Sequence, residues 1–145
     1  MEKEICQWFK DNLDPTAICP VKFVPEYDII GKKIGKVEVK EDYLALSTGN
    51  YAIEYQNFKG EPSGLALTTA DYFVLVDYDK VCFMATSVLK DIVKNYERKK
   101  MIFMGGERFG GGRVRGYLIP REKVLQNPMV TVKDRWFPNW DGIGA

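Results

Sequence analysis

Two carboxylates and a lysine in the first third of the chain have the types and spacing of a metal site. Glu38, Val39 and Lys40 form an acid-x-lysine triplet, and Asp28 precedes it by ten residues. Alternate residues of a strand share a face, so Glu38 and Lys40 would point one way and Val39 the other, into a core. Two adjacent carboxylates bind a hard divalent cation, and a lysine beside them can hold a water or a phosphate oxygen. The pattern therefore predicts a cation site.

The same charges have a simpler explanation. Charged residues are common enough that an E-x-K triplet should occur by chance in roughly a third of chains of this length. On the outer face of a half-exposed sheet, Glu and Lys are commonly solvated or form cross-strand pairs. The triplet alone does not identify a site, and the surrounding residues must decide.

The elements that would position these side chains follow from the hydrophobic pattern. Residues 21 to 30 and 33 to 41 are expected to form a β-hairpin whose turn sets Asp28, on its first strand, beside Glu38. Residues 51 to 56 are expected to form a third strand, entered through a Gly-Asn turn, that presents Glu54. Glu54 is interpreted either as a further metal ligand or neighbouring acid, or as an acid paired with a lysine of the hairpin.

Further elements are expected to flank this hairpin. Residues 2 to 13 have the spacing of a short amphipathic helix that packs on the sheet. Residues 72 to 76 are apolar on both faces, as in a central strand covered on both sides. Residues 81 to 85 are expected to form another strand, and Thr86 to cap the helix after it.

Two shorter elements are expected near the C-terminal end. Ile119 and Pro120 are expected to start a helical turn, since Pro suits the first helical position. Residues 130 to 132 are strand-like.

The stretch from Asp28 to Asp71, 44 of the 145 residues, resembles the phage-type branch of the PD-(D/E)XK nucleases. These enzymes share their fold with type II restriction enzymes and archaeal Holliday-junction resolvases. The likeness rests on an ordered set of motifs: Asp28, VEVKED (37 to 42), STGNYAIEYQ (47 to 56) and GEPSGLALTTADYFV (60 to 74). The chain departs from the pattern at Tyr27, where the family motif has proline.

The resemblance implies an α/β fold, a restriction-endonuclease-like mixed β-sheet flanked by helices, and metal-dependent hydrolysis of branched or duplex DNA. Asp28 and Glu38 would hold Mg2+ or Mn2+, with the backbone carbonyl of Val39 as a further ligand. Lys40 would orient or help deprotonate the attacking water, and Glu54 completes the expected catalytic group.

Related nucleases sometimes add a glutamate from an N-terminal helix, which would be Glu4 or Glu2. A solvated acid favoured by the helix dipole explains either position equally well. Two other functions stay open: a nucleic-acid-binding module of the same fold that cuts poorly or not at all, and a structural or interaction protein whose charges are merely solvated.

Composition excludes several kinds of catalytic site and indicates the cellular compartment. A length of 145 residues predicts one domain, residues 1 to 145. The absence of histidine excludes a histidine base, Ser-His or Cys-His nucleophile pairs, and nearly all zinc sites with mixed ligands. Three cysteines without C-x-x-C spacing predict reduced thiols and an intracellular protein, in the host cytoplasm if the chain is phage-encoded. No signal peptide or bilayer-spanning run is recognisable, so no membrane partner is expected.

The expected partners are DNA and a second copy of the chain. With a formal net charge of +1, DNA binding requires a local basic patch. The glycine-rich segment from 105 to 116 offers three arginines that could grip phosphates, or that could be simply solvated at a hairpin tip: Arg108, Arg113 and Arg115. Three aromatic residues near the C-terminal end could form a homodimer contact or dock on their own subunit: Trp136, Phe137 and Trp140.

Overall fold

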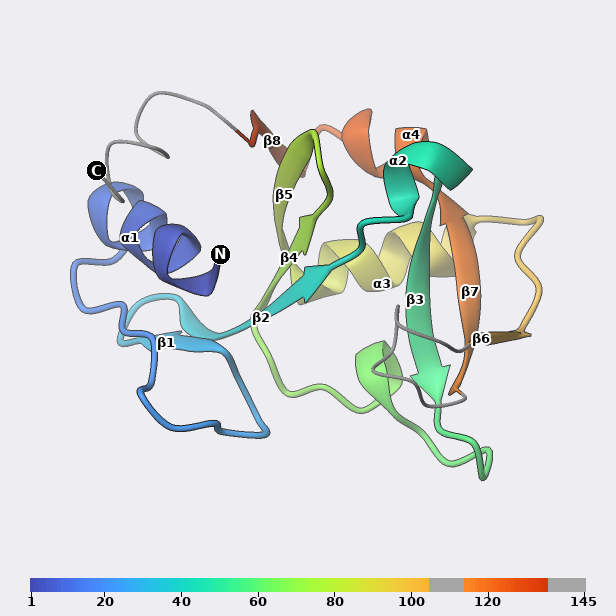
Figure 1. The fold of residues 1–145 in the computed structure, drawn as a ribbon, viewed down its shortest axis with the longest axis horizontal. Helices are drawn as coiled ribbons and strands as arrows, with labels where there is room; N and C mark the ends of the chain where they lie inside the picture. Colours follow the sequence, from blue (N-terminus) through green and yellow to red (C-terminus); the bar gives the residue numbers. More distant parts are fainter. Residues whose placement is uncertain (105–113, 136–145) are drawn as a thin grey trace.

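The structure is a computed structural model, and it describes residues 1–104 and 114–135. Two sheets lie side by side in it, with helices packed around them (Figure 1). The coarse expectation of an α/β protein with a mixed sheet flanked by helices is confirmed.

The larger sheet has five strands in the order β1-β2-β4-β5-β8. Their bounds are β1 Ile29–Gly31, β2 Gly35–Glu41, β4 Tyr72–Val76, β5 Lys80–Ala85 and β8 Thr131–Asp134. β2 and β4 are parallel, and the other pairs are antiparallel. The prediction of a central strand at 72 to 76 is confirmed, because β4 occupies the middle of the sheet and its last four residues are buried.

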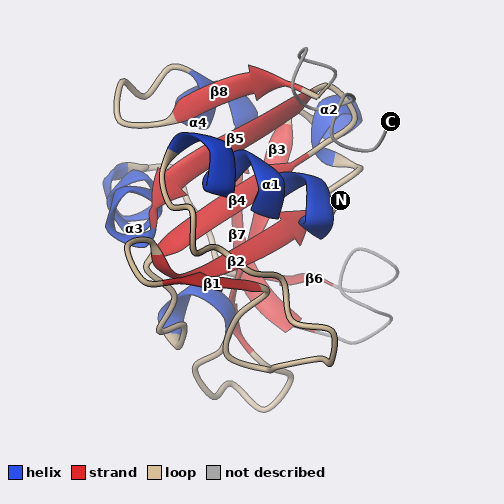
Figure 2. Cartoon of the chain, turned by 90° about the vertical axis from the view of Figure 1, so that its left-hand side faces the viewer, coloured by secondary structure: helices blue, strands red, loops and turns tan. Residues whose placement is uncertain are grey.

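One face of this sheet is covered by α1 (Glu2–Asn12), which lies across the strands (Figure 2). Ile5, Trp8 and Phe9 point into a core that includes Val37 and Val74. Each fully buried side chain of this size contributes about 1.5–3 kcal/mol. The expected helix at 2 to 13, packed on the sheet, is therefore confirmed.

The opposite face packs against α3 (Thr86–Asn95) and the second sheet. The second sheet has the order β3-β7-β6, with bounds β3 Asn50–Gln56, β7 Val114–Pro120 and β6 Ile102–Met104. Leu75 of β4, Leu89 of α3 and Ile119 of β7 meet in one core.

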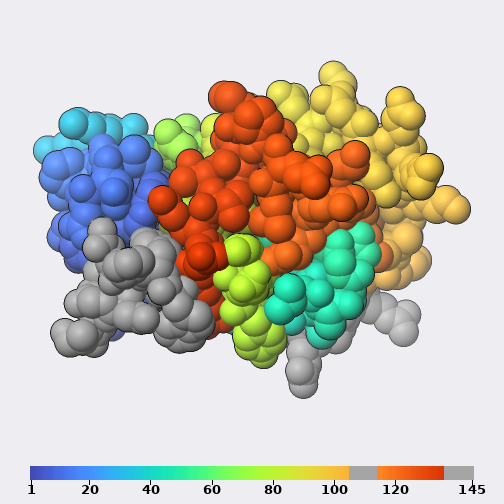
Figure 3. All heavy atoms as spheres, turned by 90° about the horizontal axis from the view of Figure 1, so that it is seen from above, coloured from blue at the N-terminus to red at the C-terminus, as the bar shows by residue number. Residues whose placement is uncertain are grey.

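Three short helical segments complete the described structure: α2 Ala45–Thr48, the 3-10 helix η1 Gly64–Ala66 and α4 Arg121–Leu125. Seen from above, the orange segment that contains α4 lies beside the yellow segment at the C-terminal end of α3 (Figure 3). Within the described ranges, no helix is both long and apolar enough to cross a bilayer.

Several expected boundaries are wrong. The first hairpin strand covers only Ile29–Gly31 rather than 21 to 30, so Asp28 precedes the strand instead of lying on it. Pro25, in the middle of the expected strand, lacks an amide donor and so disfavours sheet pairing at its own position. Thr86 does not cap α3; it is the first helical residue, with Ala85 at the cap position and no side-chain cap bond. Pro120 ends β7 and caps α4 rather than entering it.

The strand at 50 to 56 exists, but it does not extend the hairpin. β3 pairs with β7, with Ala52 opposite Leu118, and so belongs to the second sheet. The chain is redirected by α2, which ends at Gly49 in the left-handed conformation (φ 77°) that glycine adopts at little cost.

Candidate functional site

Asp28 continues the β1–β2 ladder with its side chain. The Asp28 backbone N–H donates to the Val37 carbonyl, and the Val39 N–H donates to Asp28 Oδ2, each at 2.8 Å. Backbone pairing between β1 and β2 extends only to Ile29 opposite Val37. The carboxylate therefore serves as the acceptor that a longer β1 would have offered, and this fixes it beside the acid-x-lysine triplet.

Glu38 points to the face of β2 opposite α1, because Val37 and Val39 fill the core under that helix. Its side chain is 17% exposed, and its Oε2 lies 3.7 Å from the Lys40 Nζ. That distance makes an ion pair but is too long for a hydrogen bond. Oε2 is buried, and it has no hydrogen-bond partner among the described residues. A buried carboxylate oxygen without a donor is costly unless a ligand satisfies it.

The electrostatic surroundings of Glu38 favour a cation. Burial raises the pKa of Glu38 above its ordinary value; Lys40 opposes this effect, and the nearby Asp28 carboxylate adds to it. A neighbouring carboxylate disfavours the ionised form of Glu38. A divalent cation between the two carboxylates would offset their repulsion and would bind the oxygen that has no hydrogen-bond donor.

The donor set fits a hard cation that keeps several waters. Asp28 and Glu38 supply carboxylate oxygens, and the Val39 carbonyl is available from the same strand. No group of three His, Cys, Asp or Glu side chains suited to a metal occurs in the ranges that the structure describes. Mg2+ is commonly bound through one or two carboxylates with waters completing its octahedron, so the two-carboxylate set matches its chemistry.

Glu54 approaches from the second sheet. It lines a cavity of about 310 Å³ between the sheets, together with Lys40. The other lining residues are Glu41, Asp42, Tyr51, Ala52, Ile53, Gly64, Leu65, Phe73 and Leu75. Among the described ion pairs, none joins Glu54 to Lys40 or to Lys36. The structure thus brings Glu54 and Lys40 to one cavity without pairing them.

Gly64 holds one side of this cavity. A Cβ built on Gly64 would lie 2.4 Å from the Glu54 carbonyl oxygen. The φ angle of Gly64 is 54°, in the left-handed region. Only glycine allows η1 to pack this closely on β3. The glycine of the PSG motif therefore positions the backbone that carries Glu54.

The two N-terminal acids differ in their surroundings. The Glu4 carboxylate binds the N-terminal ammonium of Met1 at 2.8 Å. Burial raises the pKa of Glu2, and repulsion from Asp28 and Glu41 adds to it. Glu2, rather than Glu4, is thus the acid of α1 that feels the Asp28 carboxylate.

The predicted DNA-binding arginines are only partly described. Arg108 and Arg113 lie outside the described residues. Arg115 is on β7, where its Cζ lies 4.5 Å from the centroid of the Phe103 ring. The proposed dimer contacts also lie outside the described residues: Trp136, Phe137 and Trp140.

Sequence reasoning assigned no role at the site to three residues that support it. The Thr68 Oγ1 lies 3.5 Å from Glu38 Oε1. Asp71 Oδ2 accepts a hydrogen bond of 3.0 Å from the Lys36 N–H at the start of β2. Asp14 is fully buried, and its Oδ2 accepts bonds from the amides of Lys33 and Ile34 in the hairpin turn. The Asp-Pro-Thr sequence at 14 to 16 was a usable signal, since aspartate often bonds the backbone near a turn.

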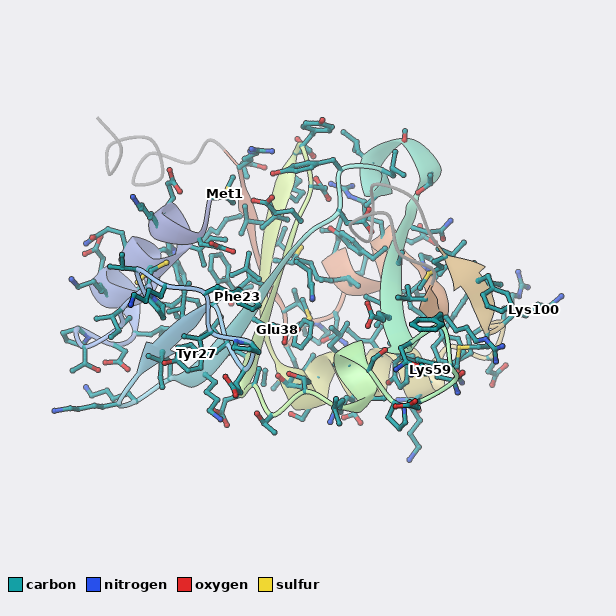
Figure 4. The ribbon with its side chains drawn as sticks, turned by 60° about the horizontal axis from the view of Figure 1, so that its bottom comes forward. Met1, Phe23, Tyr27, Glu38, Lys59 and Lys100 are labelled. Carbon is teal, nitrogen blue, oxygen red and sulfur yellow. The ribbon has the colours of Figure 1, made fainter. Side chains whose placement is uncertain are left out.

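Figure 4 places Glu38 in the middle of the molecule, with Phe23 and Tyr27 towards one end and Lys59 and Lys100 towards the other. Comparison of the chain with models of known protein families and with curated proteins found no match.

Proposed function

We propose that this protein is a metal-dependent DNA endonuclease with a restriction-endonuclease-like fold and a PD-(D/E)XK site. The observation that supports it is the environment of Glu38. Its buried Oε2 lacks a hydrogen bond, it lies in the field of the Asp28 carboxylate, and the Lys40 ammonium is 3.7 Å away. The Glu38 side chain is only 17% exposed, which distinguishes it from a solvated surface acid.

The metal would be held by Asp28, Glu38 and the Val39 carbonyl. Mg2+ or Mn2+ bound there supplies Lewis-acid stabilisation of the phosphoryl oxygen and lowers the pKa of a coordinated water. The hydrogen bond from the Val39 amide keeps Asp28 oriented, so that its carboxylate need not reorganise when the ligand set forms.

Lys40 would act on the substrate side of the site. Its side chain is 53% exposed, so its ammonium can reach a phosphate oxygen and the attacking water. It would offset the charge that develops as the bond from water to phosphorus forms and the bond to the leaving oxygen breaks. Glu54, in the same cavity, would hold a water or accept its proton.

Plasmid nicking tests the proposal. The purified chain is incubated with supercoiled plasmid in Mg2+, Mn2+, Ca2+ or excess chelator. Cleavage should appear with Mg2+ or Mn2+, vanish in chelator, and be weak or absent with Ca2+, whose looser coordination positions water poorly. A panel of branched and linear DNAs then identifies the preferred substrate.

Variants separate metal chemistry from a contaminating activity. Glu38→Ala should abolish cleavage, whereas Glu97→Ala, which removes an exposed acid just after α3, should not. Undiminished cleavage in chelator would contradict the proposal. DNA binding without cleavage in every metal would instead support a binding module.

A further inference from the structure

At one end of the second sheet, two exposed aromatic rings each lie close to the cationic group of a basic side chain. Phe58 is 65% exposed and Phe103 is 62% exposed. The Lys59 Nζ lies 5.6 Å from the Phe58 ring centroid, and the Arg115 Cζ lies 4.5 Å from that of Phe103. We name these four residues the aromatic–basic ledge: Phe58, Lys59, Phe103 and Arg115.

The strand pairing places Arg115 at the centre of the ledge. Arg115 is opposite Phe103 in the β6–β7 register and opposite Gln56 in the β3–β7 register. Its Nη1 also lies close to the loop that follows β3, since a Cβ built on Gly60 would be 3.9 Å from it.

The loop that carries Phe58 and Lys59 is organised by its own hydrogen bonds. Asn57 Oδ1 accepts the amides of Lys59 and Glu61 at 2.9 and 3.0 Å, and the Gly60 amide donates to the Asn57 carbonyl. The ledge is therefore built from strand pairing and a closed turn. In Figure 4, Lys59 lies at the end of the molecule away from Met1, on the side where Lys100 adds a further positive charge.

The ledge has one polar group without a hydrogen-bond partner and two exposed rings, and a bound partner could contact all of them. Arg115 Nε is buried and has no hydrogen-bond partner within the described ranges. Two large rings stay exposed although burial would favour each. Only Glu61 adds a negative charge within this turn, against the charges of Lys59 and Arg115.

These features select an unpaired strand of nucleic acid over a duplex. Single strands are bound by aromatic side chains on which bases stack and by cations that meet the backbone, with added cation–π attraction from Arg. In a duplex the base faces are already stacked, so exposed rings would gain little. A protein partner would not require cations placed against both rings.

We infer that the aromatic–basic ledge binds unpaired nucleotides, and that the substrate of the proposed nuclease carries a single-stranded segment. The second part rests on the proposed function, whereas binding by the ledge does not. β3 connects the two regions, because Glu54 lines the cavity with Lys40 and Phe58 follows four positions later. A strand held on the ledge would thus be led towards Lys40.

Fluorescence anisotropy in excess chelator tests the ledge without any chemistry. The probes are a labelled oligothymidine of about 12 nucleotides, within the usual site sizes of about 4–16, the same strand with abasic positions, and a duplex of equal length. Phe103→Ala and Phe58→Ala should each weaken binding of the oligothymidine at least about fivefold. Their effect on the abasic strand and the duplex should be much smaller.

Two variants keep the test interpretable. Phe103→Leu retains apolar bulk without a π face and should behave like Phe103→Ala if stacking is the cause. Tyr78→Ala removes an aromatic residue of similar exposure (61%) from the β4–β5 turn and should leave binding unchanged.

Three outcomes would overturn the inference: equal affinity of the unaltered chain for normal and abasic strands, unchanged affinity in both phenylalanine variants, or an equal loss with Tyr78→Ala. Failure of the proposed function looks different. If the chain binds oligothymidine through the ledge but never cleaves DNA, the inference about the ledge stands and the proposed nuclease function is wrong. If the chain cleaves DNA and the ledge variants bind normally, the nuclease function stands and the inference about the ledge is wrong.

Discussion

The Val39 amide donates a 2.8 Å hydrogen bond to Asp28 Oδ2, so one carboxylate both completes the sheet edge and offers a candidate metal ligand. The two roles can be separated by substitution. Asp28→Asn would keep a side-chain oxygen for the Val39 amide and lose the negative charge, whereas Asp28→Ala would lose both.

The first prediction compares these two variants. Asp28→Asn should lose metal affinity and cleavage while changing the free energy of unfolding little. Asp28→Ala should lose the same activity and about 1 kcal/mol of stability in addition, the usual net value of one hydrogen bond. Calorimetric titration with Mg2+ and urea unfolding measure the two effects. Unchanged Mg2+ binding in Asp28→Asn would remove Asp28 from the ligand set.

The second prediction concerns Lys40. Lys40→Ala should lower the cleavage rate by about 100- to 1000-fold, the loss typical of one preorganised charge-stabilising group, and should retain much of the Mg2+ affinity because lysine is not a ligand. Single-turnover cleavage and calorimetry give the two values. Lys36→Ala is the matched control, since Lys36 is on the same strand and contacts Thr69 instead of Glu38. Equal losses in the two lysine variants would contradict the assignment.

The third prediction is a pH dependence of stability due to Asp14. Burial alone would raise the pKa of Asp14, but hydrogen bonds from Thr16, Ile34 and Lys33 outweigh it and hold the pKa well below its usual range. A group with a depressed folded-state pKa stabilises the fold above its unfolded pKa, about 3.9 for Asp, and this stability is lost as pH falls below that value.

Urea unfolding between neutral pH and about pH 2 should therefore show a loss of stability that starts near pH 4. In Asp14→Asn the chain should be less stable at neutral pH, and its acid-dependent loss should be smaller. Asp91→Asn, an exposed aspartate on α3, provides the control. An acid transition of equal size in Asp14→Asn would show that other carboxylates cause it.

The fourth prediction concerns the connection between the sheets. Asp77, fully buried after β4, accepts hydrogen bonds of 2.8 Å from both the Tyr51 hydroxyl of β3 and Arg121 Nε of α4. Burial opposes ionisation of Asp77, yet the hydrogen bond from Arg121 lowers its pKa.

Arg121→Ala should destabilise the chain by about 3 kcal/mol, because it leaves a buried carboxylate without its cation. Tyr51→Phe should cost about 1 kcal/mol, since only one neutral donor is lost. Thermal and urea unfolding measure both. A cost of Arg121→Ala no larger than that of Tyr51→Phe would show that the remaining donors suffice for Asp77.

Local pattern alone predicted most of the elements near the site. The amphipathic spacing of α1 and α3, the apolar run of β4 and the alternation in β2 are each properties of a short stretch. The pairing of Asp28 with β2 is also local, because one turn joins the two segments and brings the carboxylate within reach of the triplet. Composition excluded histidine chemistry for the same simple reason.

Tertiary structure decided where β3 belongs, which acid of α1 is repelled by the Asp28 carboxylate, and which groups surround Arg115. β3 pairs with β7, so that Ala52 meets Leu118 across 66 residues of sequence, and no short-range pattern specifies such a partner. Burial of Tyr51, Leu75 and Ile119 in one core selects the pairing that brings Glu54 to the same cavity as Lys40. Strand register depends on which apolar faces become buried together, and that is a property of the whole fold.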